Sequence, residues 1–286
     1  MQPRLAFSAN AFKRTTFEVA ALAVASLGYR GIEVYADTPH FYPLETTPQT
    51  ASDVVALLKS LGLAVSNVNA FTMFHDGDTW RPSFLETDGT RRRLRIEHTV
   101  AALEMSRRMR GATVSTEPGG PLPEGESRET AMALFAEGLR EVLDRTAATD
   151  VLLLVEPEPS LLIETVGQAE ELLEMFADPR LSINLDAGHF FCVGEDPAEV
   201  IRRLEGRFDH VHIEDIGADR VHRHLVPGDG AMDFRSIFTA LRDVLYDGFI
   251  TVELYPFEET PEEAARRAIE HLAPIYGEVF GKDPRK

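Results

Sequence analysis

The sequence contains one cysteine and no long apolar run. A lone cysteine, Cys192, cannot form an internal disulfide, and we expect it to be a small buried residue and not a nucleophile. A membrane span needs about 18 or more consecutive apolar residues, so no membrane partner is predicted. The first residues, MQPRLAFSANAFKR, also lack the apolar core of a signal peptide. We therefore expect a cytoplasmic location.

Basic residues are scarce, with 29 Lys and Arg against 47 Asp and Glu and a formal net charge of −18. Such a negative field opposes a phosphate backbone, so nucleic acid is not an expected partner. The basic residues that do cluster are Arg91, Arg92, Arg93, Arg95, Arg107, Arg108 and Arg110. Apolar residues and glutamates alternate with them at helical spacing, and we interpret the cluster as a solvated helix face.

A glycine-rich phosphate turn is also missing after the first predicted strand, where an open doubly wound sheet usually carries one. The chain has Ser8-Ala9-Asn10-Ala11 there. Eight strand signals alternate with eight helix signals, and 286 residues over eight units is about 36 residues per unit. Parallel neighbours need crossover helices, and this unit length favours closure. Because no linker interrupts the pattern, we predict an α/β fold with a single (β/α)8 TIM-barrel domain over residues 1–286.

The apolar patterns place the individual elements. Strands are predicted at 4–8, 31–35, 63–70, 112–115, 151–155, 181–185, 210–213 and 249–254. Helices are predicted at about 15–27, 50–61, 89–110, 127–149, 166–177, 197–205, 234–245 and from 261 onward. Thr15 with Glu18 predicts a capping box for the first helix, and Thr260 before Pro261 predicts a cap for the last.

Four predicted strands in the second half each end in a side chain that can bind a metal or move a proton: Glu156, Asp186, His212 and Glu253. Their spacings of 30, 26 and 41 residues are about one strand-plus-helix unit each. In a parallel barrel the carboxyl ends of all strands lie at the same rim. Three carboxylates and one imidazole at one point would repel strongly without a cation between them. The pattern therefore predicts a divalent-metal site and an enzyme.

Two further polar residues follow these strand ends closely. Glu158 lies two residues after Glu156 and points to the same side while the chain stays extended. A solvated pair of loop glutamates is the alternative. His189 follows Asp186 by three residues and can add a second polar contact. Both residues are candidates for contacts with a ligand.

Two loops offer weaker candidates. Between strands seven and eight, Arg220 and His224 provide donors for ligand oxygens, although a mobile surface loop is an equally good interpretation. After strand three, Phe74 and Trp80 could form a lid or an aromatic wall. The loop between strands seven and eight also contains Gly228 and Gly230, which would allow a tight backbone turn beside a ligand.

At these residues the chain resembles the sugar-phosphate isomerase/epimerase group of xylose-isomerase-like TIM barrels, with ketose 3-epimerases as the nearest type. The segments that carry the resemblance are Gly31-Ile32-Glu33-Val34, Val155-Glu156-Pro157, Asp186 with Gly188-His189, His212-Ile213-Glu214-Asp215, His224 with Pro227-Gly228-Asp229-Gly230, and Val252-Glu253. The resemblance implies one divalent ion, often manganese, held by Glu156, Asp186, His212 and Glu253. It implies that the two glutamates are the catalytic acid and base, and that Glu158, His189, Arg220 and His224 contact the substrate.

A ligand set of carboxylate oxygens and one imidazole suits Mn²⁺, Mg²⁺ or Co²⁺. It does not resemble a zinc site built from cysteine thiolates. We expect Mn²⁺, with Mg²⁺, Co²⁺ or Zn²⁺ as alternatives. The expected function is a metal-dependent epimerase or isomerase of a ketose or keto-sugar, in which Glu156 and Glu253 transfer protons through an enediolate. The expected partner is a small sugar or sugar derivative, and a homo-oligomer is compatible with the sequence.

Other functions remain open at this point. A metal-dependent lyase or dehydratase acting on an oxidised sugar or glycoside would differ in one step, because its enolate would expel a β-substituent. A barrel that binds sugar without catalysis is ranked lower. A repair-type nuclease is also ranked lower, because it would need several more metal-binding histidines and a basic face. Fold-level analogy alone does not choose among these functions.

Overall fold

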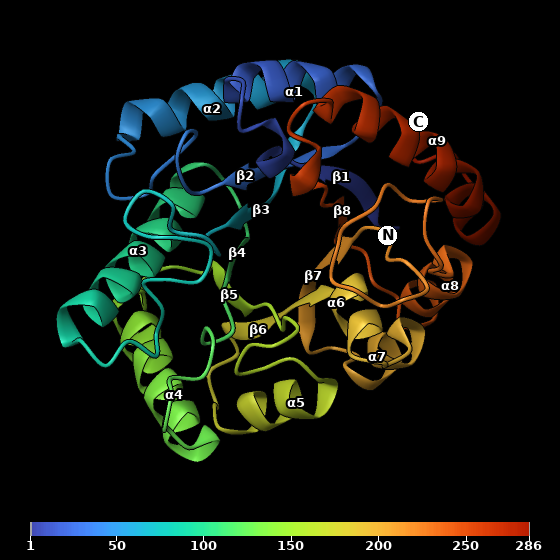
Figure 1. The fold of residues 1–286 in the computed structure, drawn as a ribbon. Coiled ribbons are helices and arrows are strands. Elements are labelled where there is room, and N and C mark those ends of the chain that lie inside the picture. The colour runs from blue at the N-terminus through green and yellow to red at the C-terminus, as the bar shows by residue number, and fades with distance from the viewer. Residues whose placement is uncertain (1, 286) are drawn as a thin grey trace.

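Eight parallel strands follow one another around a closed barrel, and β1 pairs with β8 to complete it (Figure 1). The computed structural model describes residues 2–285. The predicted (β/α)8 barrel is therefore confirmed. The strands are β1 (Arg4–Ser8), β2 (Gly31–Tyr35), β3 (Ala64–Asn69), β4 (Thr113–Thr116), β5 (Leu152–Val155), β6 (Leu181–Asp186), β7 (Phe208–Ile213) and β8 (Phe249–Val252).

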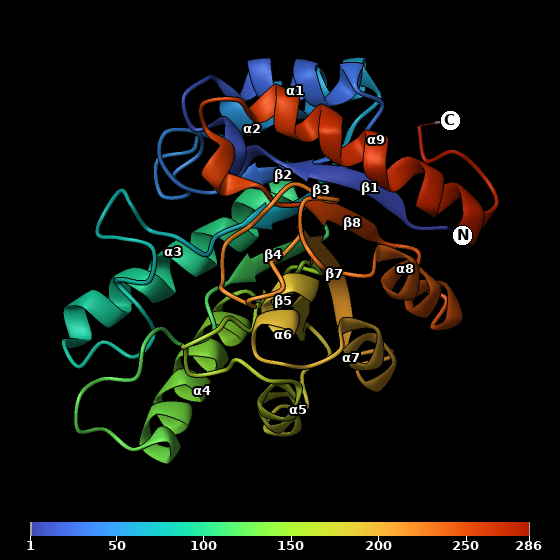
Figure 2. The same ribbon diagram turned by 45° about the vertical axis from the view of Figure 1, so that its right-hand side comes forward.

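Helices surround the barrel on its outer side (Figures 1 and 2). They are α1 (Phe17–Ser26), α2 (Pro48–Leu61), α3 (Gly89–Arg108), α4 (Arg128–Arg145), α5 (Val166–Glu174), α6 (Ala187–Cys192), α7 (Pro197–Arg203), α8 (Phe234–Asp243) and α9 (Pro261–Phe280), with short 3-10 segments η1 (Ala9–Phe12) and η2 (Tyr255–Phe257). Within residues 2–285, none of these helices combines the length and the hydrophobicity that crossing a membrane requires.

Helix α6 was not predicted, because six residues are too few to show a helical period. It begins directly after β6, and the Asp186 side chain caps it by accepting a hydrogen bond from the His189 backbone N–H at 2.8 Å. The helix turns the chain back at the rim. His189 is thereby held beside the strand end that precedes it.

The predicted cap of α1 is wrong, and that of α9 is confirmed in position but makes no side-chain hydrogen bond. The N-cap of α1 is Thr16, whose hydroxyl accepts a hydrogen bond from Val19 N–H at 3.4 Å. Thr15 instead donates to the Phe12 carbonyl at 3.2 Å, so the capping box with Glu18 does not form. Thr260 makes no side-chain capping bond to α9. The Pro261 at the first position is sufficient to mark that start.

The interpretation of the basic cluster as a solvated helix face is wrong for Arg95. Its side chain is fully buried, whereas those of Arg91 and Arg93 on the same helix are 44% and 62% exposed. The Arg95 guanidinium donates to the carbonyls of Pro82 at 2.8 Å and Ala70 at 3.1 Å. Its Nε also lies 3.9 Å from Glu117 Oε1. Arg95 thus lies on the face of α3 that packs on the barrel.

The strand register brings the ends of β5 to β8 to the same rim. Asp186 is paired with His212 across β6 and β7, and Ile213 with Val252 across β7 and β8. The Glu253 backbone N–H then donates to the Ile213 carbonyl at 3.0 Å, and that of Glu156 donates to Thr116 at 3.1 Å. The last backbone bonds of the barrel therefore fix the positions from which the candidate site residues extend.

Candidate metal centre and adjoining cavity

Glu156, Asp186, His212 and Glu253 each offer one ligand atom, and these four atoms lie within 4.8 Å of one another. Nδ1 of His212 is at the middle of the group. It lies 2.8 Å from Glu156 Oε1, 3.8 Å from Glu253 Oε1 and 3.9 Å from Asp186 Oδ2. All four side chains are buried. The structure brings together the four residues that the strand spacing selects, and their role as metal ligands remains a prediction.

The other ring nitrogen of His212 faces Glu33, which the sequence analysis did not select as a site residue. Glu33 lies in β2, is completely buried, and places Oε2 2.6 Å from His212 Nε2. Metal-binding histidines usually donate their second N–H to a carboxylate or carbonyl in this way. An N–H at Nε2 leaves Nδ1 free to face an ion. A carboxylate inside the short apolar strand Gly31–Tyr35 is the sequence signal that could have identified it.

The charges of this pair are strongly coupled. Burial alone would raise the pKa of Glu33, but His212 lowers it to about 2. Burial would likewise lower the pKa of His212, but Glu33, Glu156 and Glu253 raise it well above its ordinary value. One imidazole therefore serves several carboxylates at once. The remaining negative charge has no counterpart among these side chains.

Glu253 and Asp186 show the consequence of that imbalance. Burial raises the pKa of Glu253 to about 8; His212 opposes this shift and Glu156 adds to it. The Glu253 carboxylate accepts hydrogen bonds from the amides of Asn10 at 2.8 Å and Asn69 at 3.1 Å. Asp186 Oδ2 is buried and accepts no hydrogen bond from an N–H or hydroxyl group among the described residues; the neighbouring Glu214 carboxyl can donate to this carboxylate only when it is protonated. A divalent cation would satisfy this oxygen and balance the acids, so the residues present fit such an ion.

Glu214, two residues after His212, is a second buried acid beneath the group. While this acid and Asp186 are both ionised, neither of its carboxylate oxygens finds a hydrogen-bond donor among residues 2–285, and once protonated Glu214 can donate to Asp186. Burial and the nearby Asp186 raise its pKa well above the ordinary value, which favours the protonated form. A Cβ on Gly188 would lie 1.6 Å from Glu214 Oε1. A side chain at Gly188 would therefore force the Glu214 carboxyl to move from its present position.

The glycine-containing loop after β7 is ordered by Asp215. The Asp215 carboxylate accepts hydrogen bonds from the backbone N–H groups of Gly228 at 2.8 Å, Gly230 at 2.9 Å and Met232 at 3.1 Å. A Cβ on Gly230 would lie 2.3 Å from Asp215 Oδ1. This packing carries His222 and His224 back over the rim. These contacts favour an ordered loop over the mobile surface loop that the sequence left open as an alternative.

A cavity of about 500 Å³ opens beside the four rim residues. It is lined by Asn10, Lys13, Tyr35, Asn69, Phe71, Thr72, Phe74, Thr79, Trp80, Glu156, Glu158, Pro159, Ser160, His189, His222, Glu253 and Tyr255. This volume lies in the range of about 300–1,000 Å³ that is usual for small-molecule sites. Phe74 and Trp80 belong to its wall, as the prediction of an aromatic wall after strand three expects. Sequence reasoning missed His222 in the loop after β7, Asn10 within η1 and Asn69 at the end of β3. The strand-end position of Asn69 is a signal that could have identified it.

The predicted contact residues are divided by the structure. Glu158 and His189 line the cavity, and burial raises the pKa of Glu158 to about 7. Trp80 Nε1 donates to Glu158 Oε1 at 3.4 Å. His224 is 1% exposed and lies behind the wall, where its Nδ1 is 3.0 Å from the Glu253 carbonyl oxygen.

Arg220 is not among the residues that line the cavity, and its role as a substrate contact remains a prediction. Its guanidinium donates to the Phe191 carbonyl at 2.8 Å and lies 4.3 Å from the centre of the Phe191 ring. These two contacts hold it on the outer side of α6, where it lines a separate cavity of about 250 Å³. The cation–π contact and the hydrogen bond explain the placement.

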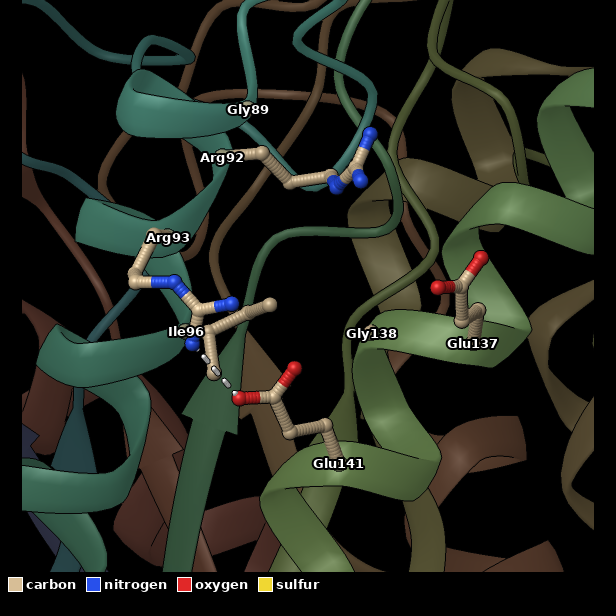
Figure 3. A pocket seen from close by; sticks show the side chains of 7 residues that line it. All are labelled: Gly89, Arg92, Arg93, Ile96, Glu137, Gly138 and Glu141. Carbon is tan, nitrogen blue, oxygen red and sulfur yellow. Dashed lines mark hydrogen bonds and ion pairs between the residues drawn. The ribbon is translucent and has the colours of Figure 1, made fainter.

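Two other features contribute nothing to this site. Cys192 is only partly buried, and burial raises the pKa of its thiol to about 12, so it is not a thiolate nucleophile. A small cavity of about 70 Å³ between α3 and α4 is lined by Arg92, Arg93 and glutamates of α4 (Figure 3). Arg93 is paired with Glu141 at 3.1 Å. None of the predicted site residues lines it.

The fold is a closed parallel (β/α)8 barrel with three carboxylates and one imidazole gathered at the rim where its strands end. The chain belongs to the family of xylose isomerase-like TIM barrels, whose model matches residues 21–275. This confirms the predicted relationship.

Curated relatives and solved structures agree with that assignment. The chain is 30% identical over 156 residues to an inosose dehydratase of Lacticaseibacillus casei, a match that spans 48% of this chain and about half (52%) of that protein. It is 26% identical over 288 residues to an inosose dehydratase of Clostridium beijerinckii, covering 91% of this chain and 90% of the relative. These named relatives are enzymes, and the prediction of an enzyme is confirmed at that level.

Two solved structures share the fold over nearly the whole chain. A D-tagatose 3-epimerase-like protein has a TM-score of 0.82 and 19% identity, covering 97% of this chain and 98% of its own. The IOLI protein, described with a bound zinc atom, has a TM-score of 0.80 and 17% identity, covering 98% and 100%. At these identities the likeness concerns the fold.

Proposed function

We propose that this protein is a divalent-metal-dependent epimerase or isomerase of a keto-sugar, with Glu156 and Glu253 as its proton-transfer pair. The observation that carries the proposal is the placement of these two glutamates. They extend from β5 and β8, line the same cavity and lie beside the same imidazole, His212. A substrate held between them would present different faces to the two carboxylates. Removal of a proton on one face and its return on the other inverts a carbon centre.

The proposed ion would be held by Glu156, Asp186, His212 and Glu253. When bound, such an ion polarises a carbonyl oxygen and makes the adjacent C–H bond more acidic. Oxygen donors with a single imidazole favour Mn²⁺ among the alternatives. The bound zinc described for the IOLI protein supports a divalent cation in a barrel of this kind. Glu33 is a positioning residue, because its carboxylate fixes the tautomer of His212 from behind.

The amides of Asn10 and Asn69 support one of the two glutamates. Both donate to Glu253 Oε1, so they orient its carboxylate toward the cavity. Glu158, whose pKa is raised to about 7, and His189 line the cavity beside Glu156 and are the proposed hydroxyl contacts. A carboxyl with a pKa near 7 can donate or accept a proton at neutral pH.

The cavity lining favours a neutral sugar over a phosphosugar. Lys13 is the one lysine or arginine among the lining residues, and its Nζ lies 2.7 Å from Glu258 Oε1. Three glutamates line the same cavity. Phe71, Phe74 and Trp80 supply apolar surface. A phosphate group would meet unfavourable charge here, whereas a sugar ring offers hydroxyls and apolar C–H faces.

A dehydratase of a keto-sugar or cyclic keto-polyol is the second candidate, and the full-length likeness to the Clostridium beijerinckii inosose dehydratase favours it. Both candidates share the first step, in which a glutamate removes the proton beside the carbonyl. They differ in the second step, because a dehydratase must also protonate a departing hydroxyl. Glu158 is the cavity residue suited to that role.

One experiment separates the two candidates. The protein is loaded with Mn²⁺ and incubated in D₂O with a panel of ketohexoses, inososes and 3-keto-glycosides, and the products are followed by NMR. An epimerase would introduce deuterium at one carbon beside the carbonyl and yield the epimer. A dehydratase would yield a product that has lost water. If no substrate of the panel exchanges or reacts, the proposal is wrong for these classes.

Matched variants test the two glutamates. Glu156→Gln and Glu253→Gln should each lower kcat by about 10²–10⁴-fold, because each removes a proton-transfer group. Glu174→Gln, at an exposed position of α5, is the control and should retain wild-type turnover. Turnover that persists in the double variant would contradict the two-glutamate scheme.

A further inference from the structure

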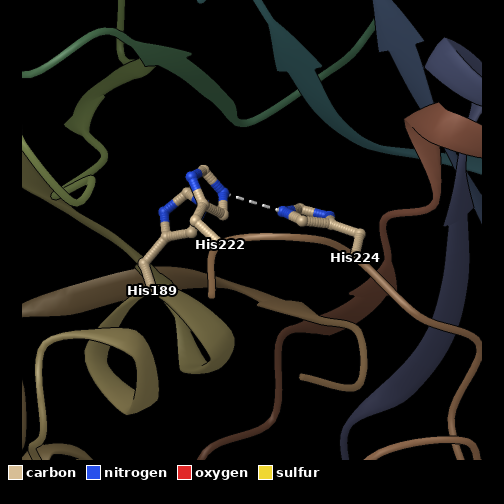
Figure 4. A group of neighbouring side chains, drawn as sticks. All are labelled: His189, His222 and His224. Carbon is tan, nitrogen blue, oxygen red and sulfur yellow. Dashed lines mark hydrogen bonds between the residues drawn. The ribbon is translucent and has the colours of Figure 1, made fainter. Parts of the chain in front are cut away.

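Two hydroxyl groups lie on the side of the large cavity that the proposed function leaves without a role. Tyr35 ends β2 and Thr72 follows the end of β3, and both line the cavity. Their strands lie across the barrel from β6 (Figure 1). His189 of α6 and His222 of the loop after β7 line the same cavity from the other side (Figure 4). A ligand in the cavity would therefore contact ring nitrogens on one side and hydroxyl oxygens on the other.

Asp37 adjoins the two hydroxyls and is completely buried. Its carboxylate accepts hydrogen bonds from the backbone N–H groups of Thr38 at 2.7 Å, Phe74 at 2.6 Å and His75 at 3.1 Å. Oδ2 accepts a further hydrogen bond from the Thr72 hydroxyl at 2.7 Å. One carboxylate thus holds the start of the loop after β3 against the end of β2, and Thr72 is fixed with it.

The hydrogens of the two hydroxyls are ordered by this carboxylate. A threonine hydroxyl carries one hydrogen, and Thr72 donates it to Asp37. The Thr72 oxygen can then only accept from Tyr35, whose oxygen lies 2.9 Å away, so the phenol donates. Burial, and next the charge of Asp37, raises the pKa of Tyr35 above its ordinary value, so the phenol keeps its hydrogen. No N–H group of residues 2–285 donates to the Tyr35 oxygen, so its lone pairs remain for a donor in the cavity.

We propose that Tyr35 is a specificity-determining residue of the cavity, whose oxygen accepts a hydrogen bond from one hydroxyl group of the substrate. The ligand class is a polyol, such as a keto-sugar, with a free hydroxyl at the position that faces Tyr35. This inference deepens the proposed function and rests on its choice of a sugar as substrate. A deoxy or O-alkylated sugar has no hydrogen to donate at that position. A phosphate ester there would bring negative charge toward Asp37.

The selectivity follows from the burial of the acceptor. Tyr35 is 2% exposed, so a ligand that fills the cavity without donating a hydrogen bond leaves the phenolic oxygen unpaired. A site built to bond a hydroxyl rejects the analogue that lacks it, because a buried polar group then loses its partner. We expect one such loss to weaken binding by about 5- to 100-fold.

Trp80 is the single tryptophan of the chain and lines the same cavity, so its fluorescence reports binding without turnover. The Mn²⁺-loaded protein is titrated with D-fructose, scyllo-inosose and methyl 3-keto-glucoside. At least one of these sugars should change the emission saturably. Tyr35→Phe should raise the Kd of that sugar by about 5- to 100-fold. Where the sugar is turned over, the loss should appear in KM, because a hydrogen bond kept through the reaction contributes equally to substrate and transition state.

Tyr246→Phe is the matched control. The Tyr246 hydroxyl donates to the Phe249 carbonyl at 2.8 Å, and this side chain is not among those that line the cavity. The control should bind each sugar with the wild-type Kd, and both variants should keep the circular dichroism of the folded protein. A control that loses affinity as Tyr35→Phe does would contradict the assignment.

Monodeoxy analogues of the sugar that binds give a second test, which begins with the wild type alone. One analogue, which lacks the hydroxyl that faces Tyr35, should bind the wild type more weakly by the same factor. That analogue should bind Tyr35→Phe and the wild type equally, since the interaction is already absent. If every monodeoxy analogue loses the same further affinity in Tyr35→Phe, the phenol acts through packing and the proposal is wrong.

The outcomes separate this proposal from the proposed function. Weaker binding by Tyr35→Phe without hydrogen exchange in D₂O would keep the Tyr35 contact and refute the epimerase. Hydrogen exchange with an unchanged Kd in Tyr35→Phe would support the epimerase and overturn the contact. No saturable response from any of the three sugars would overturn the contact as well.

Discussion

The barrel contains two groups of buried charge that differ in how the protein itself balances them. In the first, Arg95 of α3 lies 3.9 Å from Glu117, and both side chains are fully buried. The Glu117 carboxylate accepts hydrogen bonds from the backbone N–H groups of Phe84 and Gly119. One positive charge, one negative charge and backbone donors therefore share the same space.

The second group, at the rim, has acids in excess. Glu156, Asp186 and Glu253 share one imidazole, that of His212, and Glu33 occupies the other side of the same ring. Oδ2 of Asp186 accepts no hydrogen bond from an N–H or hydroxyl group among the described residues. The Arg95–Glu117 pair balances its own charge, although Nη2 of Arg95 has no hydrogen-bond partner among the described residues. A buried cluster of one sign, in contrast, stays ionised only with a counterion. The first group therefore supports the fold, and the second is suited to bind a cation.

The largest expected effect is on the complete pair. Arg95→Met would leave Glu117 buried without its cation and should lower the free energy of unfolding by about 3–5 kcal/mol. Arg108 lies on the same helix, is 36% exposed and forms an ion pair with the exposed Glu104. Arg108→Met should change the free energy of unfolding by no more than about 0.5 kcal/mol. Urea unfolding followed by circular dichroism measures both. The double variant Arg95→Met with Glu117→Gln should recover part of the loss, and no recovery would contradict a coupled pair.

Adding a metal ion to the rim group should increase stability, whereas removing the charge of Arg95 decreases it. Mn²⁺ at about 100 times its Kd should raise the free energy of unfolding by about 2.7 kcal/mol, because the ion binds the folded state. The pKa of Glu253 is raised to about 8, and the carboxyl must lose its proton to become a ligand. At a fixed Mn²⁺ concentration the stabilisation should therefore shrink as the pH falls from 8.5 to 6. Thermal unfolding with and without Mn²⁺ at both pH values measures it.

Asp186→Asn is the comparison for that measurement. It removes a rim carboxylate charge, so the Mn²⁺-dependent rise should largely disappear. Equal stabilisation at pH 8.5 and 6 in the wild type would contradict the role assigned to Glu253.

The contrast between the two groups also explains what the sequence could predict. Glu156, Asp186, His212 and Glu253 lie at or next to the ends of strands that short apolar runs identify, and the parallel topology places every strand end at one rim. Neither step needs knowledge of side-chain packing. The barrel and the four residues at its rim could therefore be predicted from the sequence.

The residues that escaped prediction are those whose environment is set by tertiary packing. Arg95 has exposed arginines on either side in the sequence, and nothing local indicates which face of α3 packs inward. Glu33 lies within a strand and not at its end, so its contact with His212 depends on the barrel interior. Arg220 is held by Phe191 of α6, a helix too short to predict. Spacing alone does not specify such contacts.

The smallest expected effect is that of Glu253→Gln on the stability of the metal-free protein. It tests the comparison of the two charged groups directly, because mutating a buried charge usually destabilises a protein, whereas this variant should be more stable. In the metal-free protein the folded-state pKa of Glu253 is about 8, against an ordinary value of 4.5. The folded state therefore binds more protons than the unfolded state between these values, and stability falls as the pH rises through that window. Glu253→Gln removes this cost. At pH 8.5 without metal the variant should be more stable than the wild type by at least about 1 kcal/mol, since one unit of pKa shift corresponds to about 1.4 kcal/mol.

The advantage of Glu253→Gln should vanish toward pH 5, where the carboxyl is protonated in the folded wild type. It should also change sign when Mn²⁺ is added, because the variant lacks a ligand. Glu174→Gln, at an exposed position, should stay within about 0.5 kcal/mol of the wild type throughout. Chemical unfolding at pH 5 and 8.5, with and without Mn²⁺, gives all four values. A variant that is less stable than the metal-free wild type at pH 8.5 would show that the rim acids are balanced from within, as the Arg95 pair is.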